Sequence, residues 1–140
     1  MAYLLSRELE TLSWDIFIQD LPKVRSVAEI PNDFFPKPMG RRDELVAKTL
    51  AHFPEVDFSD PTYGRLVRPD YTVEIALGSH EDVLGITLRV SGSRRSLEIG
   101  NKLVEMFGRR AIDSWTGESY DPTVALESFR EWKEFQDELR

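Results

Sequence analysis

The stretch SWDIFIQDLP, residues 13–22, determines how the rest of the sequence is interpreted. Its side chains alternate in the two-residue period of a β-strand, so the segment predicts a strand over about 14–19. One side of this strand is apolar: Trp14, Ile16 and Ile18. The other side carries an acid, an aromatic ring and an amide: Asp15, Phe17 and Gln19. We therefore expect one face to meet the core, and the second to be open unless another segment covers it.

Further strands follow later in the chain. Residues 71–77 and 84–90 alternate in the same way, and GSHED at 78–82 reads as the turn between them. A shorter strand is expected at 65–68, before the turn RPDY, and another within RRAIDSW at 109–115. These patterns are typical of antiparallel hairpins with one solvated face.

Four segments have the apolar spacing of helices: 3–12, 41–53, 94–107 and 122–139. Gly108 is expected at the C′ position after the third of these helices. Asp121 and Pro122 are expected as the N-cap and first residue of the last helix. This last helix carries apolar residues at helical spacing: Ala125, Phe129, Trp132, Phe135 and Leu139.

Without the two terminal helices, the element order is β-α-β-β-α-β. This order predicts an α+β protein with a ferredoxin-like antiparallel sheet and helices on one face. The length of 140 residues suits a single domain over 1–140. Within it we expect a leader helix at 1–12, a core at 13–118 and a C-terminal helical extension at 119–140.

A long loop separates the first strand from the first core helix. Residues 20–40 contain four prolines, at positions 22, 31, 36 and 38, which disfavour a helix. Long irregular segments of this kind are uncommon in compact domains and are often functional or packed down. Five apolar residues predict that this loop packs onto the core: Val24, Val27, Ile30, Phe34 and Phe35.

Composition limits the classes of function. The chain holds 25 acidic and 18 basic residues, a formal net charge of −7, which disfavours a nucleic-acid partner and favours a basic protein partner. There is no cysteine, hence no disulfide framework and no cysteine metal site. The first twelve residues lack the basic and apolar regions of a signal peptide, and no apolar run is long enough to span a membrane. We expect a cytoplasmic protein that has no membrane partner.

Acidic residues concentrate in two predicted turns. FPEVDFSDPTYG at 53–64 contains Asp57, Asp60 and Tyr63, and the turn at 78–82 contains Glu81 and Asp82. Paired carboxylates can perform acid–base chemistry, but Asp57 and Ser59 are natural turn formers and Asp60 precedes a proline, so turn chemistry explains the same residues. We take these five residues, together with Trp132 of the last helix, as a candidate partner-binding surface.

The segment SGSRRS at 91–96 is an alternative site. It lies between a predicted strand and a predicted helix, where backbone N–H groups at a helix start attract anions. The candidate anion-binding residues are Gly92, Ser93, Arg94, Arg95 and Ser96. The spacing is not that of a P-loop, and an ordinary strand–helix turn explains the same residues.

No motif of a known reaction is found in the sequence. There is no nucleophile elbow and no dinucleotide fingerprint, and the two histidines, His52 and His80, are unpaired in sequence. We therefore expect no catalytic residues, no metal and no cofactor. The aromatic residues Trp115, Tyr120, Trp132 and Phe135 suit core or helix packing, whereas an exposed subset of them would indicate a protein interface.

Four segments carry a resemblance to a family of small uncharacterised bacterial proteins: SWDIFIQDLP, SVAEIPNDFFP, DFSDPTYG and RAIDSWTGE. It covers about residues 13–118, and it supplies no catalytic residues. Segments 1–12 and 119–140 depart from the family pattern. Small acidic proteins of this type are often immunity proteins, made beside a toxin that they bind.

Two hypotheses follow. The first is a non-enzymatic cytoplasmic immunity protein that neutralises a basic protein toxin by covering its active site or substrate path. The second is a regulatory domain that binds a small anion at residues 92–96.

Overall fold

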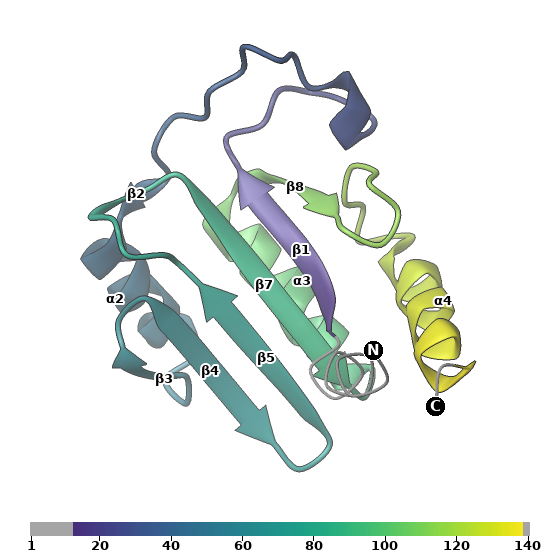
Figure 1. Ribbon diagram of the computed structural model, residues 1–140. Coiled ribbons are helices and arrows are strands. Elements are labelled where there is room, and N and C mark those ends of the chain that lie inside the picture. The colour runs from purple at the N-terminus through teal and green to yellow at the C-terminus, as the bar shows by residue number, and fades with distance from the viewer. Residues whose placement is uncertain (1–12, 139–140) are drawn as a thin grey trace, which may run out of the picture.

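The computed structural model describes residues 13–138, and the predicted leader helix at 1–12 lies outside the described residues. The protein has an α+β fold built on a mostly antiparallel sheet (Figure 1). Its main strands are β1 (Trp14–Gln19), β3 (Asp57–Asp60), β4 (Tyr63–Arg68), β5 (Tyr71–Ala76), β7 (Gly85–Gly92) and β8 (Arg110–Asp113). Two-residue strands β2 (Gly40–Arg41) and β6 (Asp82–Val83) pair separately.

The described helices are the short 3₁₀ helix η1 (Val27–Glu29) and three α-helices: α2 (Arg42–His52), α3 (Arg95–Phe107) and α4 (Ala125–Glu138). Asp43 and Glu44 lie in the first turn of α2, where the helix dipole favours negative charge. Gly108 ends α3 in the left-handed conformation, with its N–H donating to Val104 O, as predicted for a C′ glycine.

The strand order is β3-β4-β5-β7-β1-β8, which differs from the predicted four-stranded ferredoxin-like arrangement. The region between α2 and α3 contributes four strands to the main sheet, whereas three were expected from the sequence and the ferredoxin-like order has two. β3 was missed because its turn-forming residues resemble a loop. β1 lies inside the sheet, since it pairs with β7 on one side and β8 on the other.

The core lies between the sheet and the helices. Trp14, Ile16 and Ile18 are buried, as the alternation of β1 predicted, with the inward residues of β5 and β7 beside them. A Cβ placed on Gly100 of α3 would lie 3.4 Å from Val90 and 3.7 Å from Ile16, so this glycine lets the helix approach the sheet closely. Figure 1 shows α3 behind the sheet.

The C-terminal helix belongs to the same core. It begins at Ala125, three residues later than predicted, because Asp121 instead closes a turn by accepting hydrogen bonds from Thr123. Phe129 packs edge-on against Trp14, with ring centroids 5.8 Å apart. Figure 1 shows α4 beside the β8 end of the sheet, not across the open face.

A buried carboxylate connects this helix to the sheet. Asp113 of β8 is 5% exposed. Its Oδ1 accepts hydrogen bonds from Trp14 Nε1 at 2.9 Å and from the Trp115 N–H at 2.8 Å, and its Oδ2 accepts one from the Ser128 hydroxyl. One side chain thereby joins β1, β8 and α4.

The two edges of the sheet differ. The outer side of β8 is occupied by residues 118–120, because Asp113 N donates to Glu118 O and Tyr120 N donates to Ala111 O. The opposite edge is β3, which is short, carries two exposed aspartates and has an irregular register with β4.

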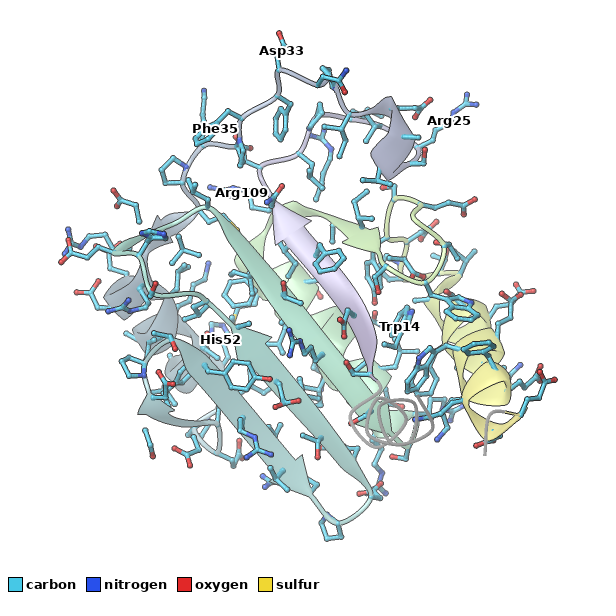
Figure 2. The ribbon with its side chains drawn as sticks, viewed as in Figure 1. Trp14, Arg25, Asp33, Phe35, His52 and Arg109 are labelled. Atoms are coloured by element: carbon cyan, nitrogen blue, oxygen red, sulfur yellow. The ribbon has the colours of Figure 1, made fainter. Side chains whose placement is uncertain are left out.

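The long loop does not pack onto the core as a whole. Leu21 is buried, but Val27 is exposed and Phe35 is 76% exposed. Figure 2 shows Asp33 and Phe35 on the arch of this loop, beyond the end of the sheet. The prediction that all its apolar residues face the core was therefore wrong, because backbone hydrogen bonds near its two ends hold the loop in place.

Candidate functional site

An apolar pocket lies where the open face of β1 meets the long loop. Its volume is about 420 Å³, within the range of pockets that take ligands or partner side chains. The lining comes from β1, β7, β8 and the loop: Phe17, Ile18, Gln19, Leu21, Val27, Ile30, Gly85, Ile86, Thr87 and Ile112. We call this the loop pocket.

The floor of the loop pocket is set by strand register. Phe17 of β1 is the Cα partner of Thr87 on one side and of Ile112 on the other. Gly85 faces Gln19, and a Cβ there would lie 2.9 Å from the Gln19 side chain. The missing side chain at Gly85 thus leaves space into which the Gln19 amide extends.

The wall of the pocket is the beginning of the long loop, which is held by hydrogen bonds. Val27 N donates to Gly117 O at 2.7 Å, and Ser119 N donates to Arg25 O at 2.7 Å. Leu21 O accepts a bond from the Arg110 guanidinium at 3.0 Å. These contacts fix Leu21 and Val27 over the end of β1 and hold the wall of the pocket in place.

Beside the pocket, charges alternate across five strands of the open face. Successive register partners run from β3 to β1: Asp57, Arg65, Glu74, Arg89 and Asp15. Arg65 Nε lies 3.4 Å from Glu74 Oε2. Cross-strand neighbours of opposite charge stabilise a solvated sheet face, so this row has a structural explanation of its own.

Two groups of this face have shifted pKa values. Partial burial raises the pKa of Asp15, against the lowering effects of the Ser13 hydroxyl and of Arg89. Partial burial also raises the pKa of Tyr63, and the hydrogen bond that its hydroxyl donates to Glu74 Oε2 adds to this. Tyr63 therefore stays protonated and fixed in place.

Four of the predicted partner-binding residues lie close together. Thr62 O accepts hydrogen bonds from the N–H groups of Leu77 and Gly78, which places the β3–β4 turn beside the loop that leads to β6. Arg42 Nη1 donates to Ser79 O at 2.6 Å. Hydrogen bonds from Thr62 lower the pKa of Asp60, and the charge of Arg42 adds to this effect. Asp60, Tyr63, Glu81 and Asp82 thus flank the start of α2.

We call the charged part of this region the acidic corner: Arg41, Arg42, Asp43, Glu44, Asp60, Glu81 and Asp82. Arg41 lies 3.6 Å from Asp43 and 3.9 Å from Glu81. The corner holds five acids and two bases, so its formal charge is −3.

Two predicted partner-binding residues lie elsewhere. Asp57 is at the far end of β3, where its Oδ1 accepts hydrogen bonds from the N–H and the hydroxyl of Ser59. Trp132 is 2% exposed and packs against Phe129, so its side chain is not part of any surface. The inclusion of Trp132 was wrong because its position faces the core rather than solvent.

The predicted anion site has its central donors occupied. Ser93 N donates to Asp70 O at 2.9 Å, and the Ser93 hydroxyl donates to the Asp70 carboxylate at 2.8 Å. Ser96 is buried, and its hydroxyl donates to Ser93 O. Arg94 and Arg95 are exposed, but both donors of Ser93 are already bonded to Asp70.

The two histidines are not brought into a cluster. His52 Nδ1 lies 3.0 Å from Lys48 O, and His80 is exposed in the loop before β6. Within residues 13–138, no group of three or more histidine and acidic side chains is arranged to hold a metal ion.

The loop pocket was only partly visible in the sequence. Phe17 was identified on the second face of the first strand, but Val27 and Ile30 were taken for core residues and Ile112 was not singled out. The available signal was the apolar content of a proline-rich loop that follows an amphipathic strand.

Comparisons with known proteins give no further information. No family model, no curated protein and no solved structure matches this chain. None of the helices in the described part of the chain has the length and apolar character needed to cross a membrane.

Proposed function

We propose that this chain is a non-enzymatic protein-binding protein of the immunity type, which acts in the cytoplasm. It neutralises a basic toxin by occlusion: once bound, it covers the active site or the substrate path of the toxin. The open face of the sheet and the loop pocket form the binding surface.

The observation that carries this proposal is the loop pocket with its exposed apolar rim. Phe17 is 42% exposed on a strand whose other side is fully buried, and Val27 on the opposite wall is also exposed. Solvated apolar side chains gathered around a pocket mark sites where proteins bind partners. Aromatic side chains in such positions supply much of the binding energy.

The charge of the chain supports a basic partner. A formal net charge of −7 accelerates association with a basic protein and slows association with an acidic one. Occlusion needs no reacting group on the inhibitor, only a surface that fits the toxin.

The proposal is tested by purifying the tagged chain from its native host and identifying what co-elutes. We expect a protein in stoichiometric amount that stops growth when expressed alone and permits growth when the chain is co-expressed. A host partner that is harmless by itself would contradict the immunity function.

A pair of variants connects this result to the pocket. Phe17→Asp places a charge in the floor of the loop pocket. Val124→Asp makes a similar change at an exposed residue just before α4, which lies outside the sheet and outside the pocket lining. We expect Phe17→Asp to lose protection against the toxin and Val124→Asp to keep it, with both variants checked for folding by circular dichroism. Equal protection by both variants would exclude the pocket as the contact.

A further inference from the structure

We propose that the partner is recognised by one row of residues across the open face, which we call the stripe. The partner places a bulky apolar side chain in the loop pocket at one end of the stripe, and lysine or arginine side chains at the acidic corner at the other end. The occupant is a surface segment of a basic protein. This inference rests on the proposed function and specifies the partner chemistry that it requires.

The stripe is a single row of register partners. Starting at the loop pocket, Phe17 pairs with Thr87, Thr87 with Ala76, Ala76 with Tyr63, and Tyr63 with Asp60. The two ends of the stripe are separated by four strand spacings, about 19 Å at roughly 4.8 Å per spacing. The loop pocket and Asp60 of the acidic corner thus lie at opposite ends of one row of the sheet.

The middle of the stripe has no deep pocket or protruding side chain. Thr87 and Ala76 are small and half-buried, and the Tyr63 hydroxyl is held by Glu74. A segment that spans the row meets a shallow surface between two anchoring ends. An extended segment of about six residues has the required reach, as does a helix of about thirteen residues.

Charge identifies the occupant at the second end. Asp60 is exposed, and two hydrogen bonds from Thr62 lower its pKa, so it is ionised at neutral pH. Glu81 and Asp82 are exposed beside it, and the two arginines of the corner leave it with the formal charge of −3. Lysine or arginine is therefore favoured there, and a neutral apolar ligand would fill only the pocket.

The test uses a displayed library of random peptides, long enough to span the stripe, selected on the immobilised full chain. We expect enriched peptides to combine a bulky apolar residue with a lysine or arginine at a fixed separation. Enrichment of apolar peptides without a basic residue, or no enrichment, would overturn the stripe.

Three variants assign the two ends. Val27→Asp in the pocket wall should weaken binding of a selected peptide at least about tenfold by raising its dissociation rate. Asp60→Asn combined with Asp82→Asn should slow association several-fold and reduce its salt dependence. Glu105→Gln, an exposed charge removal on α3, should change neither rate.

The outcomes separate this inference from the proposed function. Peptides that bind all three variants as tightly as the unaltered chain would overturn recognition through the stripe, even where a host toxin is still neutralised. A stripe that selects the expected peptides, in a chain that protects against no host toxin, would overturn the immunity function alone.

Discussion

At the scale of single residues, Asp113 has the largest structural role among the polar groups of the core. Its carboxylate satisfies the Trp14 indole N–H, a backbone N–H and the Ser128 hydroxyl in a buried position. Asp113→Ala leaves these donors unpaired and should lower the free energy of unfolding by about 2–4 kcal/mol. Asp113→Asn keeps an acceptor for Trp14 and should lose less. Urea denaturation measures both, and equal losses would contradict this role of the carboxylate.

Gly92 shows how a backbone contact restricts one residue. It has a φ of +93°, and a Cβ there would lie 2.4 Å from the Asp70 carbonyl oxygen. Gly78 has a similar φ of +82°, with nothing within 4 Å of its Cβ position. Gly78→Ala should cost about 1–2 kcal/mol from strain alone, and Gly92→Ala clearly more because of the clash. The urea midpoints of the two variants measure this difference. Equal midpoints would contradict the clash at Gly92.

At the scale of elements, the long loop combines held and free segments. The N–H groups of Val27, Ser119 and Met39 donate to backbone carbonyls at 2.7 Å, whereas the arch around Phe35 is exposed. We expect hydrogen exchange to be slow at those three amides and fast at Asp33 and Phe35. Uniformly fast exchange through residues 20–39 would show that the pocket wall is not held in solution.

Local sequence patterns predicted which segments form strands and helices, but they did not predict the order of the strands in the sheet. The alternation in β1, β5 and β7 and the apolar spacing of α2 and α3 were readable because each pattern is contained in one segment. The pairing of β1 with β8 joins residues almost one hundred positions apart, as the Trp14–Asp113 bond shows with its separation of 99. No local pattern records that separation, so the sheet order and the position of Ile112 beside Phe17 could not be predicted.

At the scale of the whole molecule, aspartates whose pKa values shift in opposite directions contribute to the acid response. Hydrogen bonds from Ser59, Thr62 and Thr123 lower the pKa values of Asp57, Asp60 and Asp121 below the ordinary value of 3.8. The stability that these groups contribute is present above pH 3.8 and is lost as the pH falls through their folded values. We therefore expect net destabilisation in acid.

Asp15 acts in the opposite direction. Burial raises its pKa above 3.8, with Glu74 adding to the shift and Arg89 opposing it, so the folded protein binds this proton more tightly and gains stability as the pH falls through the raised value. Asp15→Asn removes that gain. Urea unfolding between about pH 6 and about pH 2.5 should show a steeper loss of stability in the variant than in the unaltered chain. A shallower loss of stability in Asp15→Asn than in the unaltered chain would show that the pKa of Asp15 is not raised on folding.

The candidate site also shows where sequence reasoning ends. Asp60, Glu81 and Asp82 were selected as acidic turn residues, and the fold brings them together. Val27 and Ile30 were assigned to the core because the residue type alone does not show whether an apolar side chain is buried or exposed. Trp132 was placed on the surface for the same reason, and only the docking of α4 shows that it is buried.

The two edges of the sheet limit how this protein meets other chains. Residues 118–120 already occupy the hydrogen-bonding groups on the outer side of β8, and β3 ends the sheet with a short, bulged strand that carries two aspartates. Neither edge offers the long, uncharged template on which a fibril grows, and two copies that approached through β3 would repel each other. We therefore expect the folded protein to resist sheet-to-sheet polymerisation even at high concentration.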